Sequence, residues 1–148
     1  MTTLATKMLY SFLFLAGAAS SETRPELDET RIFEAERSAL ACGTKQISEL
    51  FQLSADFGNL PAFDATLAEV LSAANERIIF KCPNEFLSTL ENESHEVKMA
   101  VSYHIGVFEI EKLDCLLQAK STGKHKDLIE KYFRNSVDPR LSCTENGA

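Results

Sequence analysis

The sequence lacks the short patterns by which many catalytic and metal sites are recognised. It contains no Cys-x-x-Cys, no His-Glu-x-x-His, no Gly-x-Ser-x-Gly, no glycine-rich phosphate loop and no calcium-binding loop. Zinc sites, thioredoxin-like redox sites, serine hydrolases and phosphate-binding sites normally carry one of these patterns. The sequence therefore predicts neither a cofactor nor a metal site, and it favours a protein that is not an enzyme.

Basic residues and long apolar runs are also scarce. The 148-residue chain has 15 Lys and Arg against 22 Asp and Glu, which gives a net charge of −7. Binding to nucleic acid or to an anionic membrane surface requires clustered Lys and Arg, so neither partner is expected. After residue 20 no apolar run approaches the roughly 20 residues that span a bilayer, so we expect no membrane span in the mature chain.

The most apolar segment lies near the N-terminus, over residues 8–18. Lys7 precedes it and the small residues 17–21 follow it, which is the layout of a secretory signal peptide. A membrane anchor is the alternative, but the run is short for that purpose. We expect a signal peptide over residues 1–20 and one secreted, extracellular domain over residues 21–148, whose net charge becomes −8 once Lys7 is removed.

Four cysteines, all after residue 20, predict two disulfides. Widely spaced cysteines in even number are typical of disulfide bonds in a secreted chain, rather than of metal ligands or free thiols. Three pairings are possible for four cysteines, and sequence alone does not decide between them. We favour Cys42 with Cys82, which helices of the expected lengths place at similar heights, and Cys115 with Cys143, which lies in a C-terminal tail.

Apolar residues recur at helical spacing through the rest of the chain, and no convincing strand is present. Gly43 marks either a kink or a true break in the first helix, with Thr44 as a possible new cap. The sequence predicts an all-α bundle of four to five helices, mainly antiparallel neighbours because the connections are short. The expected helices cover about residues 25–59, 61–82, 95–120 and 125–135, with a short helical turn over 85–90. The buried stripe expected on the second helix consists of Phe63, Leu67, Val70, Leu71, Ala74 and Ile78.

The helix over residues 95–120 is apolar on most sides, so we expect it at the centre of the bundle. His104 is either a catalytic base or ligand or, as we favour, a structural histidine at the edge of the core, because no nucleophile or metal partner accompanies it. His95 is expected in a solvated helix start, and His125 in a basic first turn that neutralises exposed acids of its neighbours. On one helix His104 would share a stripe with Val97, Val101, Phe108, Glu111 and Cys115.

Two polar features concern the surface. The acids of residues 28–38 alternate with Arg31 and Arg37, and we expect a solvated helix face there rather than a metal site. Asn92 begins an Asn-x-Ser triplet in a polar connector, and we expect it to be glycosylated in a secreted chain.

These observations predict binding rather than catalysis. We expect a secreted, acidic protein-interaction module or effector with an extracellular protein partner, and the net negative charge favours a basic one. The alternative is a carrier of small apolar, lipid-like ligands, because eight of the ten phenylalanines follow residue 20 and can either fill the core or line a cavity. An exposed apolar patch would favour the module, and a closed apolar cavity would favour the carrier.

Overall fold

A computed structural model describes residues 26–133 and residue 143, and the regular structure in these residues is entirely α-helical. The all-α class predicted from the sequence is confirmed, with seven short helices in the described residues where four to five were expected. The helices are α1 Glu29–Ala39, α2 Thr44–Gly58, α3 Ala65–Lys81, α4 Pro83–Glu91, α5 His95–Tyr103, α6 Ile110–Lys120 and α7 Lys126–Tyr132.

Three of these helices start at a side chain that accepts a hydrogen bond from the first turn. Asp28, Asp64 and Ser94 each precede a helix and accept from the backbone N–H three residues further on, at 2.8, 3.1 and 3.3 Å. α4 begins at Pro83, whose missing N–H would have no helical partner at that position anyway. Local capping therefore accounts for the starts of α1, α3, α4 and α5.

The interruption between α1 and α2 is a true break and not a kink. Cys42 has a left-handed backbone with a φ of 60°, and Gly43 follows as the extended N-cap of α2. Thr44 is the first residue of α2 and does not cap it. The turn brings Cys42 to Cys82 at the end of α3, with 5.6 Å between their Cα atoms.

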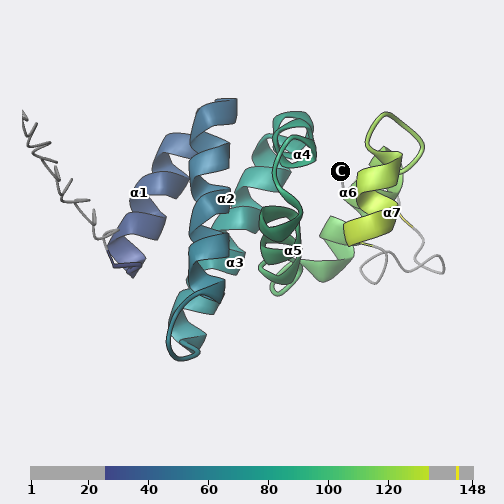
Figure 1. Cartoon of the computed structure of the whole chain (residues 1–148). Helices are drawn as coiled ribbons and strands as arrows, with labels where there is room; N and C mark the ends of the chain where they lie inside the picture. The colour runs from purple at the N-terminus through teal and green to yellow at the C-terminus, as the bar shows by residue number, and fades with distance from the viewer. Residues whose placement is uncertain (1–25, 134–142, 144–148) are drawn as a thin grey trace, which may run out of the picture.

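The prediction of one helix over residues 95–120 is wrong. α5 ends at Tyr103, α6 begins at Ile110, and Gly106 in the loop between them has a φ of +81°. A left-handed residue interrupts the hydrogen-bond pattern of an α-helix, and glycine adopts this conformation without steric strain. The loop leads the chain from the middle of the bundle to α6 and α7 at its end (Figure 1).

The helices stand side by side, with α1 at one end and α6 and α7 at the other (Figure 1). α2 packs against α1, α3, α4 and α5, while α3 packs against α1, α2, α4 and α6. The antiparallel pair α2–α3 therefore occupies the central position that the sequence predicted for residues 95–120. The fully buried side chains of this pair include Leu50, Phe51, Leu71, Ile78 and Ile79.

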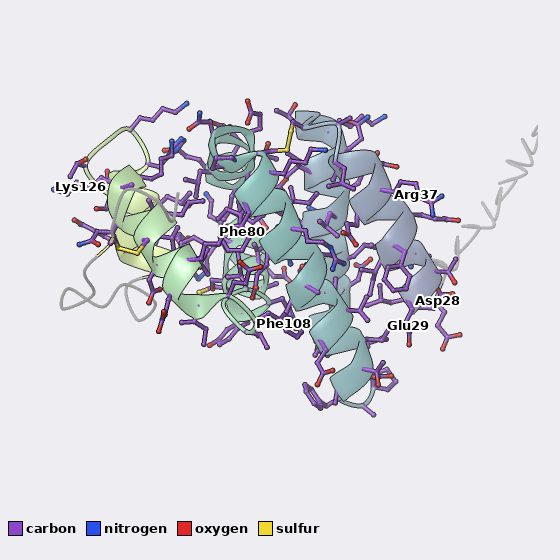
Figure 2. All side chains as sticks on the ribbon, turned by 180° about the vertical axis from the view of Figure 1, so that it is seen from behind. Asp28, Glu29, Arg37, Phe80, Phe108 and Lys126 are labelled. Carbon is purple, nitrogen blue, oxygen red and sulfur yellow. A yellow bond between two sulfur atoms is a disulfide. The ribbon has the colours of Figure 1, made fainter. Side chains whose placement is uncertain are left out.

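Both predicted disulfides and their favoured pairing are confirmed. Cys42 is bonded to Cys82 and Cys115 to Cys143, so no cysteine is free. The first bond ties the α1–α2 junction to the α3–α4 junction, and the second ties α6 to residue 143, as the yellow sulfur bonds in Figure 2 show. Among the described residues, no helix combines the length and the apolar character needed to cross a membrane.

Candidate functional site

An open and largely apolar groove lies where α2, α3 and α5 meet, near the turn that joins α2 to α3. We call it the apolar groove. Its volume is about 460 Å³, and its walls come from the end of α2, the first half of α3, the end of α5 and the loop after α5. Volumes of this order are common in sites that bind ligands. The apolar wall residues include Phe57, Phe63, Ala68, Ala100, Tyr103 and Val107.

The rim of the apolar groove carries side chains that folding usually buries. Phe63 is 77% exposed, Tyr103 is 74% exposed and Val107 is 50% exposed. Phe108, the next residue of the loop after α5, and Ile110, the first residue of α6, are also more than half exposed (Phe108 is labelled in Figure 2). Exposed apolar surface costs about 25 cal/mol per Å², so a concentration of it at one groove makes this groove a candidate binding site.

Phe63 lies outside the core, although the sequence placed it on the buried stripe of the second helix. It precedes Asp64, the N-cap of α3, so it belongs to the connecting turn and not to the helix. Its ring packs edge to face against Phe57, with 5.8 Å between the ring centroids. The prediction failed because the apolar spacing continues past the helix start, where it no longer determines the direction of a side chain.

A buried amide holds the base of the apolar groove together. Asn75 on α3 is fully buried, and its side-chain NH₂ group donates to the Ser54 hydroxyl and to the backbone carbonyl of His104, both at 3.1 Å. One side chain thus joins α2, α3 and the residue that ends α5. Because buried hydrogen bonds are costly to break, this contact fixes the relative positions of three walls.

Glu76, the next residue on α3, holds the loop that forms the remaining wall. Its side chain accepts hydrogen bonds from three successive backbone N–H groups, those of Val107 at 2.6 Å and of Phe108 and Glu109 at 3.1 Å each. Glu76 is only 3% exposed, and hydrogen bonds to a carboxylate are about twice as strong as neutral ones. The loop after α5 therefore has a fixed backbone although its side chains face solvent.

His104 forms part of the groove wall and is half-buried. Its ring stands edge to face against Phe57, with 4.7 Å between the ring centroids. Burial lowers the pKa of His104 below its ordinary value, so the imidazole is neutral near pH 7. A neutral ring keeps this wall of the groove free of charge.

The stripe that the sequence predicted for His104 does not exist, because α5 ends one residue before it. Val97 and Val101 lie on the buried face of α5 as expected. Phe108 and Glu111 lie beyond the break and are exposed, and Cys115 belongs to α6 and its disulfide. The structure therefore separates His104 from the acid and the cysteine with which the sequence grouped it.

The polar residues of the apolar groove do not form a catalytic set. Ser54 and Ser72 are buried in its walls, and Glu69 is exposed at its edge. Within the part of the chain that the structure describes, no hydrogen bond or ion pair joins the His104 ring to either serine or to Glu69. A serine nucleophile requires a base in hydrogen-bond reach. In this structure the His104 ring does not serve as such a base for Ser54 or Ser72.

Asn92 lies in the exposed turn between α4 and α5. Its side-chain NH₂ group donates to the Ser88 carbonyl at 2.8 Å. The turn adjoins the first residue of α5, whereas the apolar groove lies at the last one, about 12 Å further along the helix. A glycan on Asn92 would therefore leave the groove open.

His95 is the first residue of α5 and is exposed, as the sequence predicted. Its Nδ1 atom lies 2.8 Å from the Tyr132 hydroxyl.

His125, which the sequence placed in a basic first turn near exposed acids, is only 2% exposed. Its Nδ1 lies 3.4 Å from the Glu91 carboxylate. Burial and the charge of Lys124 lower the pKa of His125 below its ordinary value, against the opposing effect of Glu91. His125 is followed at positions i+3 and i+4 by the buried Leu128 and Ile129, a spacing that places all three on one face.

The acidic face of α1 is only partly solvated. Glu36 is 7% exposed and forms a bidentate pair with the Arg77 guanidinium on α3, with an Nη2–Oε2 distance of 2.7 Å. Glu34 and Glu49 line a second, polar groove of about 430 Å³ between α1 and α2. No group of three or more His, Cys, Asp or Glu residues is placed to hold a metal ion in the described ranges 26–133 and 143.

The residues that shape the site were missed by the sequence analysis. Ser72, Asn75 and Glu76 recur at i, i+3 and i+4 on α3 and are all buried. A polar stripe on a helix that also carries an apolar stripe is normally assigned to solvent. The sequence offers one sign of this burial. Apolar residues lie on both sides of the polar stripe, namely Leu71, Ala74 and Ile78, and they indicate that most of the α3 surface is buried.

Comparison with known proteins provides no relative for this chain. No protein family matches the sequence, and no curated protein or solved structure is similar to it. The apolar groove is therefore interpreted from its own residues.

Proposed function

We propose that this chain is a secreted protein that acts by binding an extracellular protein partner through the apolar groove. The observation that carries the proposal is the rim of exposed apolar residues, above all Phe63 and Tyr103, which come from two different elements. Aromatic side chains of this kind are enriched among the residues that dominate binding at protein interfaces. The two rings lie where they would enclose a side chain inserted into the groove.

Secretion is supported by two features. The signal-peptide pattern of residues 1–20 lies outside the described residues and remains a sequence-based prediction. Both disulfides are of the kind that form and persist in oxidising compartments. The proposal involves no catalytic step, cofactor or nucleic acid, and the described residues that line the apolar groove include neither Lys nor Arg.

A carrier of small apolar molecules is the second candidate. The volume and the apolar lining of the groove favour it, since many ligand pockets have similar values. The groove is open, however, and its rings at positions 63 and 103 are mostly in water. A lipid-like ligand bound at this open rim would keep much of its apolar surface in contact with water. We therefore favour a protein partner over a small apolar ligand.

Native mass spectrometry of the protein from the medium of the cells that produce it tests the proposal. We expect a complex with a different protein that is lost in Phe63→Asp. Phe33→Asp is the matched control, because Phe33 is 44% exposed on α1 and does not line the groove. One apolar small molecule per chain would instead establish the carrier, and a complex that survives Phe63→Asp would exclude the groove.

We also expect Asn92 to carry an N-linked glycan in a eukaryotic secretory host. The side chain is exposed in a turn, where the modifying enzyme can reach it. Intact-mass measurement should show a glycan mass on the secreted protein and none on Asn92→Gln. Equal masses, after allowance for the substitution, would refute the prediction.

A further inference from the structure

We propose that the occupant of the apolar groove is an amphipathic helical segment of the partner that inserts apolar side chains and pairs a Lys or Arg with Glu69. The inference rests on the proposed function, because it specifies the partner at the same groove. It depends on three observations: the charge of the lining, the extent of the exposed apolar surface and the rigidity of the walls.

The charge of the lining points to a basic partner. Glu69 is the one charged side chain among the groove residues that the structure describes, because no Lys or Arg lines the groove and His104 is neutral near pH 7. Asp64, exposed beside Phe63, adds a second carboxylate near the rim. A cation brought to this edge gains attraction, whereas an anion meets repulsion.

The extent of the apolar surface favours a segment with several apolar side chains over a small molecule. Phe63, Tyr103 and Val107 line the groove and are exposed, and the next residue of the loop, Phe108, is exposed as well. An amphipathic helix presents apolar side chains at i, i+3, i+4 and i+7, and can contact the groove and the adjoining loop together.

Other occupants fit the same charges less well. A fatty acid would bring its carboxylate to the edge that Glu69 already occupies. If a second copy of this chain bound at the groove, the two edges that carry Glu69 would face each other. The chain as a whole also has a net charge of −7, so two copies repel each other. Like charges placed opposite each other weaken an interface.

The walls are preorganised for such a partner. Asn75 and Glu76 hold the end of α5 and the following loop from below, through hydrogen bonds to backbone atoms. Binding therefore requires little ordering of the groove backbone, which reduces the entropic cost of association.

The test uses fluorescent designed peptides of about four helical turns, one with a Leu face and a Lys face and one with Glu in place of every Lys. Binding to the full secreted protein is measured by fluorescence anisotropy at about 0.15 M salt, which screens long-range attraction. The variants are Glu69→Lys, Phe63→Asp and the control Glu85→Lys, which makes the same charge change at an exposed position of α4 outside the groove. Binding of laurate to the same protein is measured separately by isothermal titration calorimetry.

We expect the Leu/Lys peptide to bind the native protein at least about tenfold more tightly than the Leu/Glu peptide, a difference of about 1.4 kcal/mol. Glu69→Lys should remove this preference, Phe63→Asp should abolish binding and Glu85→Lys should leave it unchanged. If Phe63-dependent binding occurs equally with both peptides, or if Glu85→Lys weakens it as much as Glu69→Lys, the inference is wrong but the proposed function stands. If neither peptide binds and laurate does, the proposed function fails as well.

Discussion

At the scale of single residues, Glu76 is the side chain on which the groove wall most depends. Glu76→Ala should lower the free energy of unfolding by about 3 kcal/mol, because three backbone N–H groups lose a buried charged acceptor. Glu76→Gln keeps one oxygen acceptor and should lose less. Urea denaturation followed by circular dichroism measures both changes.

The control for Glu76 is Glu34→Ala, which removes an exposed carboxylate from α1. Exposed substitutions of this kind usually change stability by less than about 0.5 kcal/mol. Equal losses for Glu76→Ala and Glu34→Ala would contradict the role assigned to Glu76.

Two histidines, the half-buried His104 and the buried His125, predict how stability depends on pH. Burial lowers the pKa of His104 and of His125 in the folded chain, so the unfolded chain binds more protons just below its histidine pKa of about 6.5. The stabilising effect of the neutral rings is complete above that pH and is lost as the pH falls through the folded-state values. We expect the free energy of unfolding to decrease on acidification below about pH 6.5, with a smaller decrease in His125→Gln.

Denaturant titrations of the native protein and of His125→Gln at several pH values test this dependence. Glu91 opposes the pKa shift of His125, while Lys124 and Lys120 reinforce it, so these charges must be retained in both proteins. An identical pH dependence in the two proteins would show that His125 contributes nothing.

Polar residues of the interior were the hardest to predict. Apolar spacing correctly placed Leu67, Leu71, Ala74 and Ile78 in the core. The same criterion assigns Glu76 to solvent, because its burial depends on backbone groups about thirty residues later in the chain. Such a partner is visible only once the fold has brought the two segments together.

At the scale of helices, local signals mark some of the starts, whereas the break between α5 and α6 was not predicted. Local signals mark the beginnings of α3 at Asp64 and α4 at Pro83. The break between α5 and α6 is held by Asn75 and Glu76 of α3, which form hydrogen bonds with backbone groups of the loop. Within the loop sequence itself, Gly106 is the residue that indicates a break. Without that contact, the apolar spacing of residues 95–120 favours one continuous helix.

The disulfide between Cys42 and Cys82 should contribute more to stability than the one between Cys115 and Cys143. It closes a separation of 40 residues, for which the chain-entropy relation predicts about 4 kcal/mol, and it joins two helix junctions. The disulfide between Cys115 and Cys143 closes a separation of 28 residues, for which the same relation predicts a stabilisation of about 3.5 kcal/mol, and it connects α6 to residue 143. Urea midpoints of the two paired Cys→Ser variants should differ in this order, and the reverse order would contradict the prediction.

At the scale of the whole molecule, the apolar groove results from how the helices end rather than from any single motif. The α2–α3 turn leaves Phe63 outside the core, and the break after α5 exposes the loop that begins at His104. Helical class, the presence of two disulfides and acidic character follow from composition and spacing, whereas the sequence leaves all three disulfide pairings possible. The groove could not be predicted, because it depends on where three chain segments meet.

The central claim is that a partner protein occupies this groove, and photo-crosslinking tests it most directly. The photoreactive amino acid p-benzoylphenylalanine replaces Phe63 in one variant and Phe33, outside the groove, in another. Both are irradiated in the medium of the producing cells, and the adducts are sequenced by mass spectrometry. We predict an adduct at position 63 alone, to an apolar segment of another protein that carries Lys or Arg. Equal adducts at both positions, or an adduct to a lipid at position 63, would contradict the claim.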